Sequence, residues 1–150
     1  SKLKGEEHFE GVTVQKMIFF KGAELILGCS LDPQFGPVVL FGAGGTLVEV
    51  LKDSSLGIPP LTRYAAKQMV KKTRIYEALC GVRGEKGIDL DALYDLIMNF
   101  SRMIANEPRI QECDINPLLA SSEGLIALDC RIVCHDFSIA DEDLPHVSGP

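Results

Sequence analysis

Two apolar segments separated by a short polar turn constrain the fold of this chain more than any other part of its sequence. Residues 112–119 and 125–131 have the length of β-strands, and residues 121–124 between them include two serines and a glycine, which favour turns. Neighbouring segments of this kind pair as an antiparallel hairpin. A reversal midway between Ser122 and Glu123 fixes which residues of the two strands face each other.

The predicted register brings together side chains that can bind a metal ion. Asn116 lies opposite Asp129, and Asp114 lies opposite Arg131, with the Cβ atoms of each pair about 5 Å apart on one face. An amide oxygen and a carboxylate at that separation can share Mg²⁺ and leave positions for phosphate oxygens and water. Pro117 cannot donate to a strand ladder, so we expect an irregular backbone beside Asn116.

Each of these features has an alternative that needs no ligand. The hairpin can be a solvent-exposed one, in which Asp114 forms an ion pair with Arg131, and a shift of one residue would move Asn116 and Asp129 to opposite faces. The glycine-rich residues 41–46 can cradle a phosphate with their backbone amides. They can equally form a simple turn between strands.

Composition narrows the class of protein. The chain is 46% hydrophobic, has no apolar run near the length that spans a bilayer, and carries a formal charge of −6, which argues against nucleic-acid and membrane partners. Its five cysteines are an odd number, and Cys29, Cys80 and Cys113 lack metal-ligand or redox spacing, so we expect reduced thiols and a cytoplasmic location. Cys130, Cys134 and His135 do not predict a zinc site, because four ligands at standard spacing are missing.

The order of elements is predicted as strands, helices and then strands. Asp89 is a helix N-cap, and an apolar stripe at helical spacing follows it and predicts a buried helix face that ends near Pro108. The stripe consists of Leu90, Leu93, Ile97, Phe100 and Ile104. The other predicted elements are strands at 12–18, 24–31, 37–41 and 47–51, a helix from Thr62 to Lys72, a short helix at 75–79 and an exposed loop at 81–87.

The sequence of residues 112–131 resembles the end of the ATP-grasp module in the ADP-forming (NDP-forming) acyl-CoA synthetases and the related succinyl-CoA ligase β subunits. Those proteins carry a similar acid-x-Asn-Pro-Leu segment, a short turn and an Ala/Cys-Leu-Asp segment. Residues 22–28, 32–42 and 44–53 are similar to the synthetase branch in the same order. The resemblance implies an α/β fold of the α+β type, the ATP-grasp C-terminal lobe, with a mainly antiparallel sheet and helices on one side. It covers residues 11–136, and residues 137–150 read as a tail or interdomain linker.

The resemblance also implies roles for individual residues. Asn116 and Asp129 correspond to the family's ligands for the nucleotide-associated Mg²⁺, and Asp114 corresponds to a catalytic acid near a phosphohistidine. Glu24 is placed to hold the ribose hydroxyls of ATP or ADP. The remaining cofactor-binding residues are Gln15, Lys16 and Met17 in a hinge against the adenine, and Gly44 and Gly45 near the phosphates.

The implied reaction converts an acid, CoA and ATP to acyl-CoA, ADP and phosphate through a phosphorylated histidine. None of the three histidines, His8, His135 and His146, lies in a glycine-rich or helix-start context that would bind a phosphate. We therefore expect the carrier histidine, the CoA-binding region and the first ATP-grasp lobe to lie elsewhere in the protein or in a partner subunit, and the isolated chain to be inactive. Two alternatives remain: a regulatory synthetase-like module of an acetyltransferase fusion, and a noncatalytic subunit-assembly module.

Overall fold

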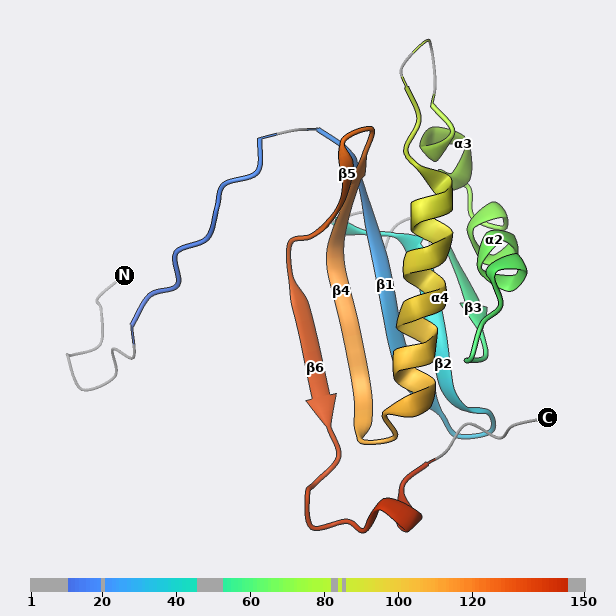
Figure 1. Cartoon of the computed structure of the whole chain (residues 1–150), viewed down its shortest axis with the longest axis vertical. Helices are drawn as coiled ribbons and strands as arrows, with labels where there is room; N and C mark the ends of the chain where they lie inside the picture. Colours follow the sequence, from blue (N-terminus) through green and yellow to red (C-terminus); the bar gives the residue numbers. More distant parts are fainter. Residues whose placement is uncertain (1–10, 20, 46–52, 82–83, 85, 146–150) are drawn as a thin grey trace.

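The computed structural model describes residues 11–19, 21–45, 53–81, 84 and 86–145. Its main element is a six-stranded sheet in which all pairs are antiparallel and the strand order is β3-β2-β1-β4-β5, with β6 also pairing with β4. The helices lie on one side, and α4 runs along the sheet (Figure 1). This confirms the predicted α+β fold. The elements are β1 (Ala23–Asp32), β2 (Gly36–Ala43), β3 (Ser54–Gly57), α2 (Arg63–Lys71), α3 (Ile75–Leu79), α4 (Leu90–Asn106), β4 (Ile110–Ser121), β5 (Gly124–Ala127), β6 (Cys130–Cys134) and the 3-10 helix η3 (Asp141–Asp143).

The hydrophobic core lies between α4 and the sheet. Leu25 and Leu27 of β1 and Val39 and Phe41 of β2 are fully buried on the helix face. The predicted stripe of α4 packs against them, because Leu93, Ile97, Phe100 and Ile104 are at most 6% exposed and Leu90 is partly buried. Burying a side chain of this size stabilises the fold by about 1.5–3 kcal/mol.

Two helix N-caps are formed by the predicted residues. Thr62 Oγ1 accepts a hydrogen bond from Ala65 N at 3.2 Å at the start of α2. Asp89 Oδ1 accepts one from Ala92 N at 3.0 Å at the start of α4. Each cap satisfies a backbone donor that has no partner within the helix, which contributes about 1 kcal/mol.

One predicted strand is absent from the described structure, and one observed strand was not predicted. No strand is assigned to residues 12–18, where the side chains of Val12 and Val14 are 80% and 91% exposed. Their alternation suits a strand, but no strand in the described part of the chain pairs with them. The sequence reading also missed β3, which pairs with Val39–Gly42 of β2. The strand predicted at 47–51 lies outside the described residues.

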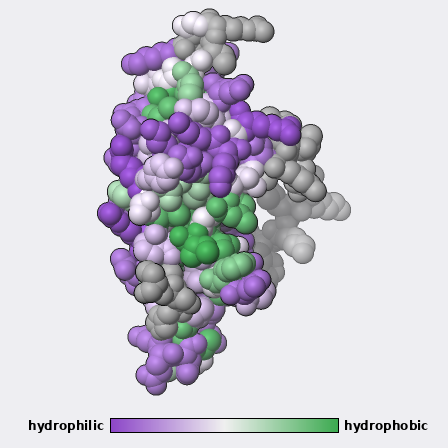
Figure 2. Space-filling view, turned by 90° about the vertical axis from the view of Figure 1, so that its right-hand side faces the viewer, coloured by the Kyte–Doolittle hydropathy of each residue, from purple (hydrophilic) through white to green (hydrophobic). Residues whose placement is uncertain are grey.

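β3 forms one edge of the sheet, on the side that also carries α2. That side shows a hydrophobic area within a mostly polar surface (Figure 2). Leu56 of β3 and Ile58, which follows it, are 61% and 54% exposed. The strand has only four residues, so it presents few unpaired backbone groups to another chain.

The described end of the chain folds back onto the start of β4. Arg109 Nη2 donates to Ile139 O at 3.1 Å and forms an ion pair with Asp141, and the guanidinium lies 5.5 Å from the centre of the Phe137 ring. Leu144 is 4% exposed. Residues 137–145 are therefore packed, and the division at residue 136 into a lobe and a separate tail stays a prediction. None of the helices in the described part is long and apolar enough to cross a membrane.

Candidate functional site

The polar site lies on the face of the sheet opposite the helices. Because side chains alternate along a strand, Glu24 of β1 and Glu112 and Asp114 of β4 point away from the buried core face. A register shift interrupts β4 in the middle of this face, since Leu25 pairs with Leu118 but Leu27 pairs with Ile115.

Asn116 and Pro117 occupy this shift, and the peptide bond between them is cis. The expected irregularity beside Asn116 is thus present in the structure as a bulge of β4 against β1. Bulges re-aim side chains and occur often next to functional sites.

The predicted hairpin register is confirmed. Asp114 pairs with Arg131 in the ladder between β4 and β6. In the short break between β5 and β6, Asn116 N donates to Asp129 O at 3.2 Å and Leu128 N donates to Pro117 O at 3.0 Å. Because of these two hydrogen bonds, β4 pairs in the same register with β5 and with β6. Asn116 therefore lies directly opposite Asp129.

After β2 the chain crosses β1 at Gly44 and Gly45 and reaches Asn116 of β4. Gly44 N donates to Glu24 O at 2.8 Å, and Gly45 N donates to Asn116 Oδ1 at 3.3 Å. A Cβ atom at Gly44 would overlap the carbonyl of Leu25, and one at Gly45 would overlap the carboxylate of Glu24. Gly45 also has a φ of 69°, which favours glycine. The crossing therefore places Glu24, Gly44, Gly45 and Asn116 together, as four of the predicted site residues.

Asn116 and Asp129 fit a hard divalent cation. Asn116 Oδ1 accepts one hydrogen bond and keeps a second lone pair. Asp129 is exposed and accepts from Cys130 N through Oδ1 at 3.0 Å, which leaves its other oxygen available. No cluster of three His, Cys, Asp or Glu residues that could hold a metal occurs in the described ranges. Two oxygen ligands are the usual protein share of a Mg²⁺ that is also bound by phosphates and water.

Arg131 does not form the ion pair with Asp114 that the sequence alternative suggested. Its Nη1 atom lies 3.8 Å from Glu112 Oε2, and both side chains are more than half exposed. Asp114 lies beside Gly28, its partner on β1. A Cβ atom at Gly28 would come within 3.4 Å of Asp114 Cβ, so a larger residue at this position would crowd Asp114. The sequence reading missed Gly28, although a glycine inside a strand is a known sign of close approach.

The predicted hinge residues do not join this site in the structure. Gln15, Lys16 and Met17 are exposed, and the N-terminal segment extends away from the sheet (Figure 1). Lys16 and Met17 lie near Glu123 and Ile126 at the turn of the hairpin. Their role at the adenine stays a prediction.

The two buried cysteines, Cys29 and Cys113, are expected to be unreactive. Burial raises the pKa of the Cys29 thiol to about 11 and that of the Cys113 thiol to about 12. Thiols protonated in this way are poor nucleophiles and poor metal ligands.

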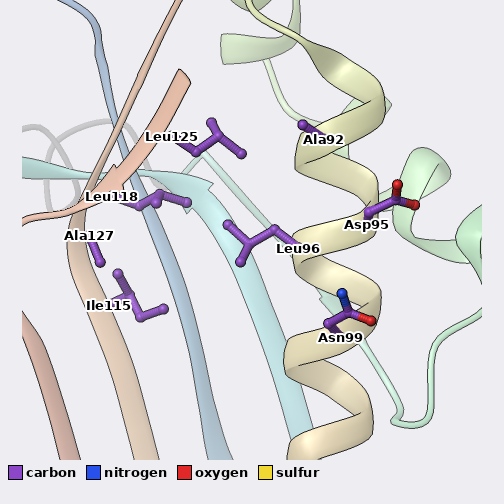
Figure 3. A pocket seen from close by; sticks show the side chains of 8 residues that line it. All are labelled: Ala92, Asp95, Leu96, Asn99, Ile115, Leu118, Leu125 and Ala127. Atoms are coloured by element: carbon purple, nitrogen blue, oxygen red, sulfur yellow. The ribbon is translucent and has the colours of Figure 1, made fainter. Parts of the chain in front are cut away.

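A separate hollow of about 500 Å³ lies on the helix side, between α4 and strands β4 and β5. Leu96 points from α4 toward Ile115 and Leu118 across it (Figure 3). Its lining is mostly apolar, which suits packing of protein rather than binding of phosphate. The lining residues are Ala92, Asp95, Leu96, Asn99, Ile115, Leu118, Leu125 and Ala127.

Known proteins match nearly the whole chain. Residues 1–134 match the model of a family described as an ATP-grasp domain. The chain is 47% identical over 124 residues to acetate–CoA ligase [ADP-forming] I of Archaeoglobus fulgidus, covering 83% of the chain and 18% of that protein. It is 42% identical over 123 residues to the beta subunit of acetate–CoA ligase [ADP-forming] I of Pyrococcus furiosus, covering 82% of the chain and 53% of the subunit.

A solved structure agrees with this match. The dinucleotide-forming acetyl-coenzyme A synthetase 1 of Ca. Korarchaeum cryptofilum, in complex with coenzyme A and Mg-AMPPCP, superposes with a TM-score of 0.74 at 38% identity, covering 78% of this chain and 55% of that one. Its phosphohistidine segment points towards the nucleotide-binding site. The chain spans about half the length of the beta subunit and less than a fifth of the single-chain ligase. The chain belongs to the ATP-grasp domain family.

Proposed function

We propose that this chain is the nucleotide- and Mg²⁺-binding lobe of an ADP-forming acyl-CoA synthetase, an acid–thiol ligase. The whole protein would convert a carboxylic acid, CoA and ATP to acyl-CoA, ADP and phosphate, with phosphate passing between the nucleotide and a phosphohistidine. One observation supports the proposal most strongly. Gly45 N donates to Asn116 Oδ1, and Asn116 lies opposite Asp129, so two oxygen ligands stand beside the glycine-rich segment.

The roles of the residues follow from their positions. Asn116 and Asp129 would hold Mg²⁺, which neutralises phosphate charge when bound. The glycine crossing at Gly44 and Gly45 lets the phosphates approach the sheet closely. Glu24, which is exposed beside Gly45, would accept hydrogen bonds from ribose hydroxyls. Catalysis of phosphoryl transfer depends mainly on such positioning and charge neutralisation.

Asp114 would act on the histidine that carries the phosphate. Its carboxylate stands two residue pairs along the ladder from the Asn116 and Asp129 pair, on the same face, next to Gly28 of β1. A carboxylate at this place can accept a hydrogen bond from one ring nitrogen and so stabilise an imidazolium. The other ring nitrogen is then directed toward the phosphate.

The complete reaction needs parts beyond this chain. We expect the other ATP-grasp lobe, the CoA-binding region and the phosphohistidine segment to come from the rest of the protein or from a partner subunit. The apolar hollow between α4 and β5 is a surface on which such a part can pack. The proposal places the protein in the cytoplasm, where its thiols stay reduced. The relatives cited above are named as ligases rather than acetyltransferases, so a regulatory role in an acetyltransferase fusion is the less favoured alternative.

The proposal is tested with Asp129→Asn in the full-length enzyme. Removing the formal charge should raise the Mg²⁺ concentration required for half-maximal ADP–ATP exchange by about tenfold or more. Folding should be preserved, because Asp129 is exposed and its side chain accepts a hydrogen bond from the adjacent Cys130 N. Asp136→Asn is the matched control, since Asp136 is also exposed and accepts a local hydrogen bond from Ser138 N. An unchanged Mg²⁺ requirement in Asp129→Asn would exclude the assignment.

A further inference from the structure

We propose that Arg131 is a catalytic cation that contacts the phosphoryl group while it passes between the nucleotide and the carrier histidine. This inference rests on the function proposed above and adds a residue to it. Arg131 was considered from the sequence only as an ion-pair partner of Asp114. Its position and its contacts in the structure indicate a different role.

The charge distribution on the polar face creates a need for a cation. Glu24, Glu112, Asp114 and Asp129 place four carboxylates on this face or at the break in the hairpin. Arg131 is the one basic residue that the described strands place there. A phosphoryl group that moves from Mg²⁺ toward Asp114 would approach these carboxylates, and Arg131 offsets their charge at this point.

Arg131 stands where the phosphoryl group would travel. It pairs with Asp114 in the ladder and lies two residues beyond Asp129, which corresponds to about 7 Å along a strand. An arginine side chain spans this distance, so the guanidinium can reach an oxygen of a phosphoryl group that lies between the Mg²⁺ pair and Asp114. Its planar donors match two phosphoryl oxygens at once.

The present contacts of Arg131 leave it free to bind an anion. Its only ion pair within the described residues is the long one to Glu112, at 3.8 Å, and its side chain is 69% exposed. An exposed pair of this length contributes little to stability, so giving up Glu112 costs little. The side chain needs only to turn from Glu112 toward the neighbouring Asp114 position.

Asp114 has a glycine as its neighbour on β1. Gly28 pairs with Asp114 on one side and with Leu40 on the other. It carries no side chain on the polar face, and a Cβ atom there would approach Cys113 O within 3.2 Å. A glycine at this position therefore puts no side chain of β1 in the way of an imidazole ring that approaches Asp114.

The chemical step balances without a further reactant. The unprotonated ring nitrogen of the carrier histidine attacks the γ-phosphorus with its lone pair and forms an N–P bond. The bond between that phosphorus and the β,γ-bridging oxygen breaks, and the oxygen keeps the electron pair and leaves as a terminal oxygen of the diphosphate. The second ring nitrogen keeps its proton, facing Asp114. Arg131 supplies positive charge to the phosphoryl oxygens during the transfer, as arginine clamps do.

The test compares two half-reactions of the full-length enzyme. Arg131→Gln should slow ADP–ATP exchange, which reports transfer between nucleotide and histidine, by about 100-fold. Formation of phosphoenzyme from acyl-CoA and phosphate should stay within about threefold of wild type, because it takes place at the other site. Calorimetric affinity for Mg-AMPPCP should also stay within about threefold. Arg131→Lys should be intermediate, and added guanidinium ion should partly restore exchange in Arg131→Ala.

Arg102→Gln is the matched control, since Arg102 is an exposed arginine of α4 on the helix side of the sheet. It should match wild type in every measurement. If Arg131→Gln catalyses ADP–ATP exchange at the wild-type rate, this inference fails while the proposed function still stands. An equal loss in both half-reactions would also overturn it, because it would indicate a structural role. If the wild-type enzyme shows no Mg²⁺-dependent exchange, the proposed function fails and this inference fails with it.

Discussion

Gly45 links the two halves of the candidate site through a single residue. Its amide donates to Asn116 Oδ1, and its α-carbon lies against the carboxylate of Glu24. Any side chain at this position would displace Glu24 and would also be strained by the φ of 69°. The two effects can be separated experimentally, because another glycine of the chain has the strain without the contact.

Gly45→Ala and Gly84→Ala form this matched pair. Gly84 has a φ of 85°, and a Cβ atom there would meet nothing within 4 Å. Both variants should lose about 1 kcal/mol of unfolding free energy in urea denaturation, because both put alanine in the left-handed region. Only Gly45→Ala should also weaken calorimetric binding of Mg-AMPPCP to the full-length enzyme, by about tenfold. Equal nucleotide affinity of the two variants would contradict the assigned role of the crossing.

At the scale of elements, the sequence predicts best the hairpins and helices that are determined by residues close together in the chain. The hairpin that joins Asn116 to Asp129 follows from its turn and its alternation, and α4 follows from its cap at Asp89 and its apolar stripe. β3 could not be predicted because Ser54–Gly57 carries no strand signal of its own. β3 pairs with β2 at Gly42, where the missing side chain lets the two backbones approach closely. A Cβ atom added to Gly42 would lie only 3.0 Å from Ser54 Cα. Nor does the sequence say that residues 12–18, which alternate like a strand, find no partner in the described chain.

Ser101 connects α4 by a hydrogen bond to Leu61, in the segment before α2. The residue is fully buried within the apolar face of the helix, where the stripe gave no reason to expect a polar group. Its hydroxyl donates to Met98 O at 2.8 Å and accepts from Leu61 N at 2.9 Å. It therefore satisfies a backbone donor of the segment that leads into α2.

Ser101→Ala should consequently lower the unfolding free energy by about 1–3 kcal/mol, because Leu61 N would remain buried without an acceptor. Urea denaturation of the folded chain measures this directly. Ser30→Ala, at an exposed position of β1, should stay within about 0.5 kcal/mol of wild type. A loss in Ser101→Ala no larger than that of the control would mean that Leu61 N finds another partner.

At the scale of the whole molecule, the two faces of the sheet have different tasks. One face is covered by α2, α3 and α4, and the other carries Glu24, Asp114 and Arg131 with Asn116 and Asp129. A single face of a sheet forms only one wall of a binding site. Ligand sites normally enclose most of a small molecule, and the match covers only 53% of the beta subunit and 18% of the single-chain ligase.

We therefore expect the isolated chain to bind Mg-ATP with no better than about millimolar affinity, which corresponds to roughly 4 kcal/mol. NMR titration should place the chemical-shift changes at Glu24, Gly45, Asn116 and Asp129, with smaller ones at Gln15 to Met17 if the exposed N-terminal segment closes over the adenine. Asp129→Asn should abolish the Mg²⁺-dependent part of these shifts, whereas the Asp136→Asn control should retain it. Micromolar affinity of the isolated chain would contradict the one-wall description, because Glu24 and Asp129 are exposed here and nothing on the described face covers the nucleotide.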